Sequence, residues 1–182
     1  MKFRSSIFYS FLFLFFLINI SCNTSKKIPV VKEVKTSPEL SSSQEIQEKY
    51  AEILKVEKHE ISSPPLYLFI DKWYGTAYEY AGKSKQGIDC SGFASLLYKA
   101  IYNKDISGAS ENILSKCKSL SREELKEGDF VFFKIDSNKV SHVGVYLQNS
   151  KFVHSTIKAG VIISDLNEIY YSKYYYCGGR VK

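Results

Sequence analysis

The sequence predicts an α+β domain in which helices come first and an antiparallel β-sheet follows. Up to residue 102, apolar residues recur at helical spacing in several segments. After Gly128 the pattern changes to that of strands, and four short β-rich runs are separated by turn residues. The 182 residues are 45% apolar and 24% charged, which suits one globular domain of ordinary size.

The N-terminus predicts export from the cytosol. Lys2 and Arg4 precede an apolar stretch over residues 7–18, which is short for a membrane span of about 20 residues. The stretch ends at Ser21-Cys22, which resembles a bacterial lipoprotein signal and implies cleavage before Cys22 and lipidation of its thiol. An ordinary signal peptide or an uncleaved anchor helix are the alternatives, and each also places the domain outside the cytosol. Because no acidic residue directly follows Cys22, we expect an outer-membrane anchor facing the periplasm.

The remaining chain divides by composition. After the signal peptide (residues 1–21), residues 22–44 are rich in Ser, Thr, Lys, Pro and Glu and predict a flexible tether. Residues 45–65 predict an accessory amphipathic helix, capped by Ser42 with Glu45, and a linker. Residues 66–182 form the predicted domain.

Within this domain we expect two helices and then strands. The helical pattern covers residues 66–73 and 89–102, with a loop between them. The strand-like runs cover residues 129–136, 142–149, 151–156, 160–165 and, near the C-terminus, 175–181. The tyrosine-rich segment before the last strand predicts a half-buried approach to that strand rather than a surface for stacking on sugars.

Charge and composition exclude several classes of function. The net charge of +6 falls to +4 without the predicted signal and is evenly spread, which argues against binding nucleic acid. Metal-binding spacings such as CxxC and HExxH are absent from the sequence, so we expect neither a metal nor another cofactor. Four cysteines are too few for a disulfide-dense scaffold, and a Cys117–Cys177 bond is left open. We expect a monomer.

Cys90 is the candidate nucleophile. It lies in Ile88-Asp89-Cys90-Ser91-Gly92, directly after a loop and at the start of a predicted helix. The N–H groups and dipole at a helix N-terminus favour the thiolate, whereas the charge of Asp89 opposes it. A small buried apolar cysteine is the alternative interpretation of this residue alone.

Two of the three histidines strengthen the catalytic interpretation. His142 begins one predicted strand and His154 lies in the next, with a turn over residues 148–151 between them. Adjacent antiparallel strands can bring the two imidazoles side by side, where His142 would take the thiol proton and His154 would orient His142. The alternative is a pair of half-exposed strand histidines.

These residues stand in blocks whose order and spacing resemble the NlpC-type family of cell-wall cysteine peptidases. Together the blocks outline a helix that carries a cysteine, followed by two strands that carry histidines. They read WYGTAYEYAG (73–82), GIDCSGF (87–93), GDFVFF (128–133), SHVGVYL (141–147) and FVHS (152–155).

The resemblance implies a papain-like fold and a metal-free triad of Cys90, His142 and His154. It implies hydrolysis of peptidoglycan stem peptides, typically at the bond between γ-linked D-glutamate and a diamino acid such as meso-diaminopimelate. It also implies that Tyr78 lies beside the nucleophile, and that Asp89 and Ser91 help to bind the amino group of the substrate.

The sequence departs from the family pattern near the predicted groove. Gly108-Ala109-Ser110 replaces a common Arg-Thr-Ser run and Ile113 replaces a common Gln, so the groove differs on that side. Two other functions fit the same resemblance. One is a catalytically silent peptidoglycan-binding lipoprotein, and the other is an amidase or acyltransferase on the same fold.

Overall fold

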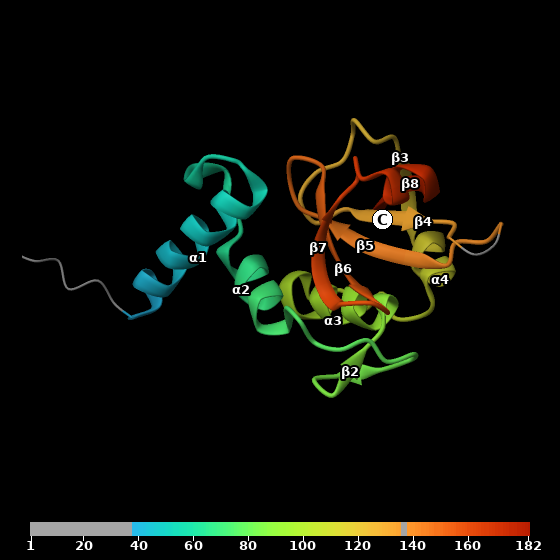
Figure 1. Cartoon of the computed structure of the whole chain (residues 1–182), viewed down its shortest axis with the longest axis horizontal. Coiled ribbons are helices and arrows are strands. Elements are labelled where there is room, and N and C mark those ends of the chain that lie inside the picture. The colour runs from blue at the N-terminus through green and yellow to red at the C-terminus, as the bar shows by residue number, and fades with distance from the viewer. Residues whose placement is uncertain (1–37, 136–137) are drawn as a thin grey trace, which may run out of the picture. The chain divides into compact units, whose positions relative to one another are not determined.

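The computed structural model describes residues 38–135 and 138–182 (Figure 1). The predicted signal peptide, Cys22 and the tether up to residue 37 lie outside the described residues. Among the helices that are described, none combines the length and the apolar character that a membrane span needs.

The first helix begins earlier than predicted. α1 spans Pro38–Leu54, so Ser42 lies inside the helix and is not its N-cap. Proline suits the first helical position because its missing N–H has no partner to lose there. α1 ends where Lys55 takes a left-handed conformation (φ 56°), and a short 3₁₀ turn, η1 (Lys58–Glu60), follows.

Two helices come next, and the second begins at Cys90. α2 spans Pro64–Trp73, so the two prolines at the end of the predicted linker open this helix instead. α3 spans Cys90–Tyr102, as predicted, and packs on the sheet (Figure 1). Between them lies a small hairpin that the sequence did not predict, formed by β1 (Lys83–Ser84) and β2 (Gly87–Ile88).

The second half forms one six-stranded antiparallel sheet in the order β3-β8-β4-β5-β6-β7, which confirms the α+β prediction. All five predicted strands are present, whereas β3 and the short helices α4 and α5 were not predicted. The bounds are α4 (Ser110–Ser115), β3 (Cys117–Leu120), β4 (Phe130–Phe133), β5 (His142–Tyr146), β6 (Lys151–Thr156), β7 (Gly160–Asp165), α5 (Ile169–Tyr174) and β8 (Tyr175–Val181).

Each face of the sheet has its own apolar core. The larger core lies between the helices and one face, and includes Phe93, Phe132 and Val145. The smaller core lies on the other face, where Phe133 and Phe152 pack against α5. Successive residues of a strand point to opposite faces, so each strand contributes to both cores.

The turn between β5 and β6 fixes the pairing of these two strands. Asn149 and Ser150 both adopt positive φ (48° and 62°), as a type I′ turn requires. The turn sets the pairs Val145↔Val153 and Tyr146↔Phe152. Continuing this alternation puts His142, Gly144 and His154 on the same face of the sheet.

Candidate active site

Cys90 is the first residue of α3, and Asp89 is the N-cap. One oxygen of the Asp89 carboxylate accepts hydrogen bonds from the Gly92 backbone N–H (2.6 Å) and the Ser91 hydroxyl (3.0 Å). The other oxygen accepts from the Ala81 backbone N–H (3.0 Å). The cap therefore fixes the start of the helix and ties it to the preceding loop.

Gly92 and Gly82 allow that loop to pack closely. A Cβ added to Gly92 would lie 2.6 Å from the Gly82 carbonyl oxygen, and one added to Gly82 would lie 2.5 Å from the Gly87 carbonyl oxygen. Backbone thus packs directly on backbone at the start of α3, which holds Cys90 in place.

His142 and His154 lie side by side on β5 and β6, as predicted. Nε2 of His142 is 2.7 Å from Nδ1 of His154, and the rings meet nearly edge to face at 77°. Gly144 makes room for this pair, because a Cβ there would lie 2.6 Å from Cδ2 of Phe152 and 3.3 Å from Cβ of His154. The His-x-Gly spacing of β5 thus lets the ring of His154 approach His142.

Cys90 meets the start of β5, where His142 lies. β5 and β6 pair at Val145↔Val153 and Tyr146↔Phe152. His142, at the start of β5, lies beyond these paired residues. There the thiol of Cys90 accepts a hydrogen bond from the Val143 backbone N–H, and its Sγ lies 3.8 Å from Oγ of Ser110. The Ser155 hydroxyl donates to the Ile88 carbonyl (2.7 Å), which ties the start of α3 to β6.

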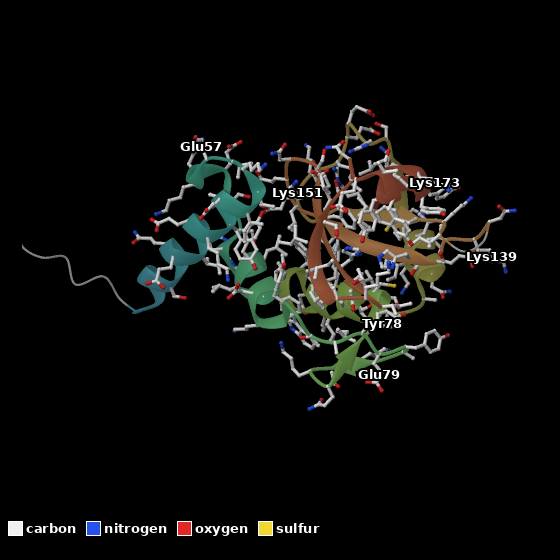
Figure 2. The ribbon with its side chains drawn as sticks, viewed as in Figure 1. Glu57, Tyr78, Glu79, Lys139, Lys151 and Lys173 are labelled. Atoms are coloured by element: carbon white, nitrogen blue, oxygen red, sulfur yellow. The ribbon has the colours of Figure 1, made fainter. Side chains whose placement is uncertain are left out.

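One cavity of about 640 Å³ joins these groups. Cys90, His142 and His154 all line it, and Lys158 and Glu168 are the charged side chains of its wall. Tyr78 also lines the cavity and lies between the hairpin and the sheet (Figure 2). The remaining wall is formed by Ile135, Ser141, Ser155, Thr156, Ile157, Ala159, Ile162, Tyr170 and Tyr171.

Burial sets the protonation states of Cys90 and His142. It raises the pKa of the Cys90 thiol, and this outweighs the opposing hydrogen bonds from Val143 and Ser110. Burial also lowers the pKa of His142 to about 4 and holds the pKa of His154 well below its usual range. Near neutral pH Cys90 is therefore a thiol and His142 a neutral imidazole, because burial outweighs the N–H groups of the helix N-terminus, which by themselves favour the thiolate.

The other predicted site residues separate into two groups. Tyr78 lies close enough for the charges of Cys90 and Asp89 to help burial raise its pKa. Asp89 and Ser91 serve the helix cap and are not among the residues that line the cavity.

Two further observations concern the remaining thiols and the possible metal ligands. Cys117 and Cys177 are both free thiols, so the possible disulfide is not formed. In the two described ranges, no group of three or more His, Cys, Asp or Glu side chains is placed to hold a metal ion.

Sequence reasoning missed three hydroxyls near the triad. Ser110 approaches Cys90, Ser155 anchors the start of α3, and Oγ of Ser164 lies 3.1 Å from Nε2 of His154. Only the period-2 pattern of residues 160–165 carried a signal for Ser164, because it places a serine on the face of β7 that meets His154.

Known proteins resemble both the sequence and the fold. The model of the NlpC/P60 family matches residues 75–180. A protein of Escherichia coli K12 named murein DD-endopeptidase MepS/murein LD-carboxypeptidase is 34% identical over 160 residues, which cover 87% of this chain and 82% of that protein. The probable endopeptidase NlpC of the same strain is 32% identical over 62% of this chain and 73% of its own length.

A crystal structure of an NlpC/P60 family protein from Bacillus cereus is similar to this fold. It superposes with a TM-score of 0.60 at 30% identity, and the match covers 64% of this chain and 39% of that one. The matched regions contain the helix with Cys90 and the strands with both histidines. The chain therefore belongs to the NlpC/P60 family.

Proposed function

We propose that this chain is a peptidoglycan hydrolase, a cysteine endopeptidase that cleaves stem peptides with Cys90 as nucleophile. The observation that carries the proposal is the 2.7 Å contact between His142 and His154 in the cavity that Cys90 also lines. The relative that is similar over most of both chains is named as a murein endopeptidase and supports the substrate class, and the second, named as a probable endopeptidase, supports the reaction. A fold alone does not imply activity, so the proposal rests on this site.

The geometry supports a division of roles within the triad. Nε2 of His142 contacts His154, which leaves Nδ1 of His142 to accept the Cys90 proton. The sulfur attacks the scissile carbonyl as this proton leaves, and the backbone N–H of Cys90 at the helix start is a donor for the oxyanion. His142 returns the proton to the leaving amine as the C–N bond breaks. Water, deprotonated by the same imidazole, then hydrolyses the thioester.

The family resemblance favours the γ-D-glutamyl–diamino acid bond as the target. A second candidate is the D,D-peptide cross-link between stem peptides, favoured by the name of the relative at 34% identity. Digestion of a purified cross-linked muropeptide dimer separates them by product mass. Cleavage of the cross-link releases two intact monomers, whereas γ-glutamyl cleavage shortens the stem to a dipeptide. An amidase would free the sugar from the peptide, and a silent binding protein would leave the dimer intact.

We also propose that the protein is held at the cell envelope by lipid on Cys22, with the domain facing the periplasm. The support is the apolar segment that ends at Ser21-Cys22. Multiple acyl chains anchor a protein stably, so the wild type should partition with membranes and incorporate labelled fatty acid. Cys22→Ser should lose the label, and Cys117→Ser is the matched control that should keep it. Unchanged labelling of Cys22→Ser would contradict the anchor.

A further inference from the structure

The hydrogen-bond chain of the triad continues beyond His154. Nε2 of His154 lies 3.1 Å from Oγ of Ser164, and a further hydrogen bond joins the hydroxyls of Ser164 and Tyr171. His154 is fully buried and Ser164 is only 6% exposed. No water competes easily for either group at such burial, so each hydrogen of the chain has a defined partner.

Three structural elements build this extension. Ser164 stands opposite Phe152 in the pairing of β6 with β7, which puts its hydroxyl on the same face as His154. Tyr171, on α5, meets the ring of His154 edge-on, with centroids 5.1 Å apart at 82°. It packs on Phe152 in the same way, at 5.0 Å and 85°. The ring of Tyr171 therefore covers His154 while its hydroxyl reaches Ser164.

The tautomer of His154 decides whether His142 can act. For His142 to accept the thiol proton at Nδ1, its own proton must be on Nε2 and must be donated to Nδ1 of His154. His154 must then carry its proton on Nε2, where the acceptor in contact is the oxygen of Ser164. If the proton of His154 moves to Nδ1, His142 is protonated on Nδ1 and has no lone pair for Cys90.

We propose that Ser164, supported by Tyr171, is a positioning residue that holds His154 in its Nε2–H tautomer and so keeps His142 ready as the base. The inference rests on the proposed function, because it assigns the same roles to Cys90 and His142. Ser164 touches neither the substrate nor the thiol; it acts through His154.

Removal of the hydroxyl should shift this tautomer. In Ser164→Ala the Nε2–H of His154 would be buried without an acceptor, which favours the Nδ1–H form. We expect kcat to fall by about 10- to 100-fold with little change in KM. Ser164→Thr, which restores the hydroxyl, should recover most of the activity. Tyr171→Phe keeps the covering ring and should cost less than Ser164→Ala, since Ser164 still accepts from His154.

Two readouts need no substrate. Nitrogen-15 NMR of the full chain distinguishes the tautomers, and assignment is simple because the chain has only three histidines. Wild type should have His154 protonated at Nε2, and Ser164→Ala should move it toward Nδ1. Alkylation of Cys90 by iodoacetamide, followed by peptide mass spectrometry, should slow in Ser164→Ala. Ser95→Ala is the matched control, because that hydroxyl bonds only the Ser91 carbonyl within α3 (2.7 Å) and should leave both readouts unchanged.

The outcomes separate this inference from the proposed function. Unchanged tautomers in Ser164→Ala would overturn the inference, even if activity fell, because the loss would then be merely structural. Full activity in Ser164→Ala would also overturn it. If wild type cleaves no muropeptide but the tautomer and alkylation shifts occur, the proposed function fails and the role of Ser164 stands.

Discussion

Cys90 and His142 carry no charge in the resting site, because burial disfavours both the thiolate and the imidazolium. In the proposed mechanism the proton therefore moves during the attack rather than before it. Neutral His142 can take the proton only if a lone pair on its ring faces the thiol. In a preformed ion pair the proton would already have moved, and the lone pair would not matter. A single hydrogen bond, between Nε2 of His142 and Nδ1 of His154, determines which nitrogen of His142 carries the lone pair.

The pH dependence of the reaction should reveal the depressed pKa of His142. The base fails when His142 is protonated, so activity should hold from neutral pH down to about pH 5 and fall as the pH drops through about 4. The measurement is kcat/KM for a soluble muropeptide across this range, with circular dichroism at each pH to confirm that the protein stays folded. An acid limb centred near pH 6.5, the ordinary value for histidine, would contradict the buried neutral base.

For single residues, the sequence predicts those contacts that are made by residues close together in the chain. His142 and His154 belong to one hairpin, so a local turn and strict alternation were enough to pair them. The neighbours of Cys90 come from distant parts of the chain, such as Ser110 and the Val143 backbone N–H. The pKa of Cys90 is raised chiefly by burial, which the local sequence around a helix N-terminus does not contain.

At the scale of the elements, the glycine of β5 is tightly packed against β6. Gly144 lies within β5 and faces Phe152 and His154 of β6, where a side chain has no space. Gly144→Ala should push Phe152 and His154 away from β5. The added Cβ would lie 2.6 Å from Cδ2 of the Phe152 ring and 3.0 Å from the Val153 carbonyl oxygen. We expect a loss of about 1–3 kcal/mol in the free energy of unfolding and a clear drop in kcat.

Gly75→Ala is the control for this substitution. Gly75 has positive φ (74°) but nothing within 4 Å of an added Cβ, so its replacement should cost stability through backbone strain and leave kcat near that of wild type. Urea unfolding and initial rates measure the two effects separately. A Gly144→Ala protein with wild-type kcat would show that the approach of His154 to His142 tolerates the extra methyl group.

Helix boundaries were harder to predict than strand positions. The strands from β6 to β8 match their predicted ranges, because turn residues bound short alternating runs. α1 instead begins at Pro38, inside the predicted tether, and α4 and β3 fall in a segment without a clear period. Short elements of this kind owe their stability to tertiary packing, which a local pattern does not contain.

At the scale of the whole molecule, the segment from α1 to α2 contacts the β5–β6 hairpin and its surroundings. The side chain of Asn149 donates to the Leu54 carbonyl at the end of α1 (3.0 Å), and that of Gln148 donates to the Glu60 carbonyl (2.6 Å). Glu127 accepts hydrogen bonds from the hydroxyls of Tyr67 in α2 and Ser62. The turn that sets the register of the two histidines is thereby connected to the N-terminal helices.

Substitution of Asn149 tests this connection. Asn149→Gly keeps the left-handed turn and removes only the hydrogen bond, so we expect a loss of about 1 kcal/mol. Asn149→Ala adds the cost of positive φ for a residue with a Cβ, so its loss should be greater. Hydrogen exchange should show faster opening at the C-terminal end of α1 in both variants. Unchanged exchange in α1 would mean that the helix docks independently of the turn.

The most direct test of the account is muropeptide cleavage by variants of the nucleophile and base. Cys90→Ala and His142→Ala should each abolish nearly all cleavage, and the double variant should be little worse, because the two residues act as one unit. His154→Ala should be milder, since water or a neighbour can partly replace an orienting group, and Cys117→Ala should retain activity. Substantial cleavage by purified Cys90→Ala, with contaminating hydrolases excluded, would contradict the central claim that the thiol of Cys90 attacks the peptide bond.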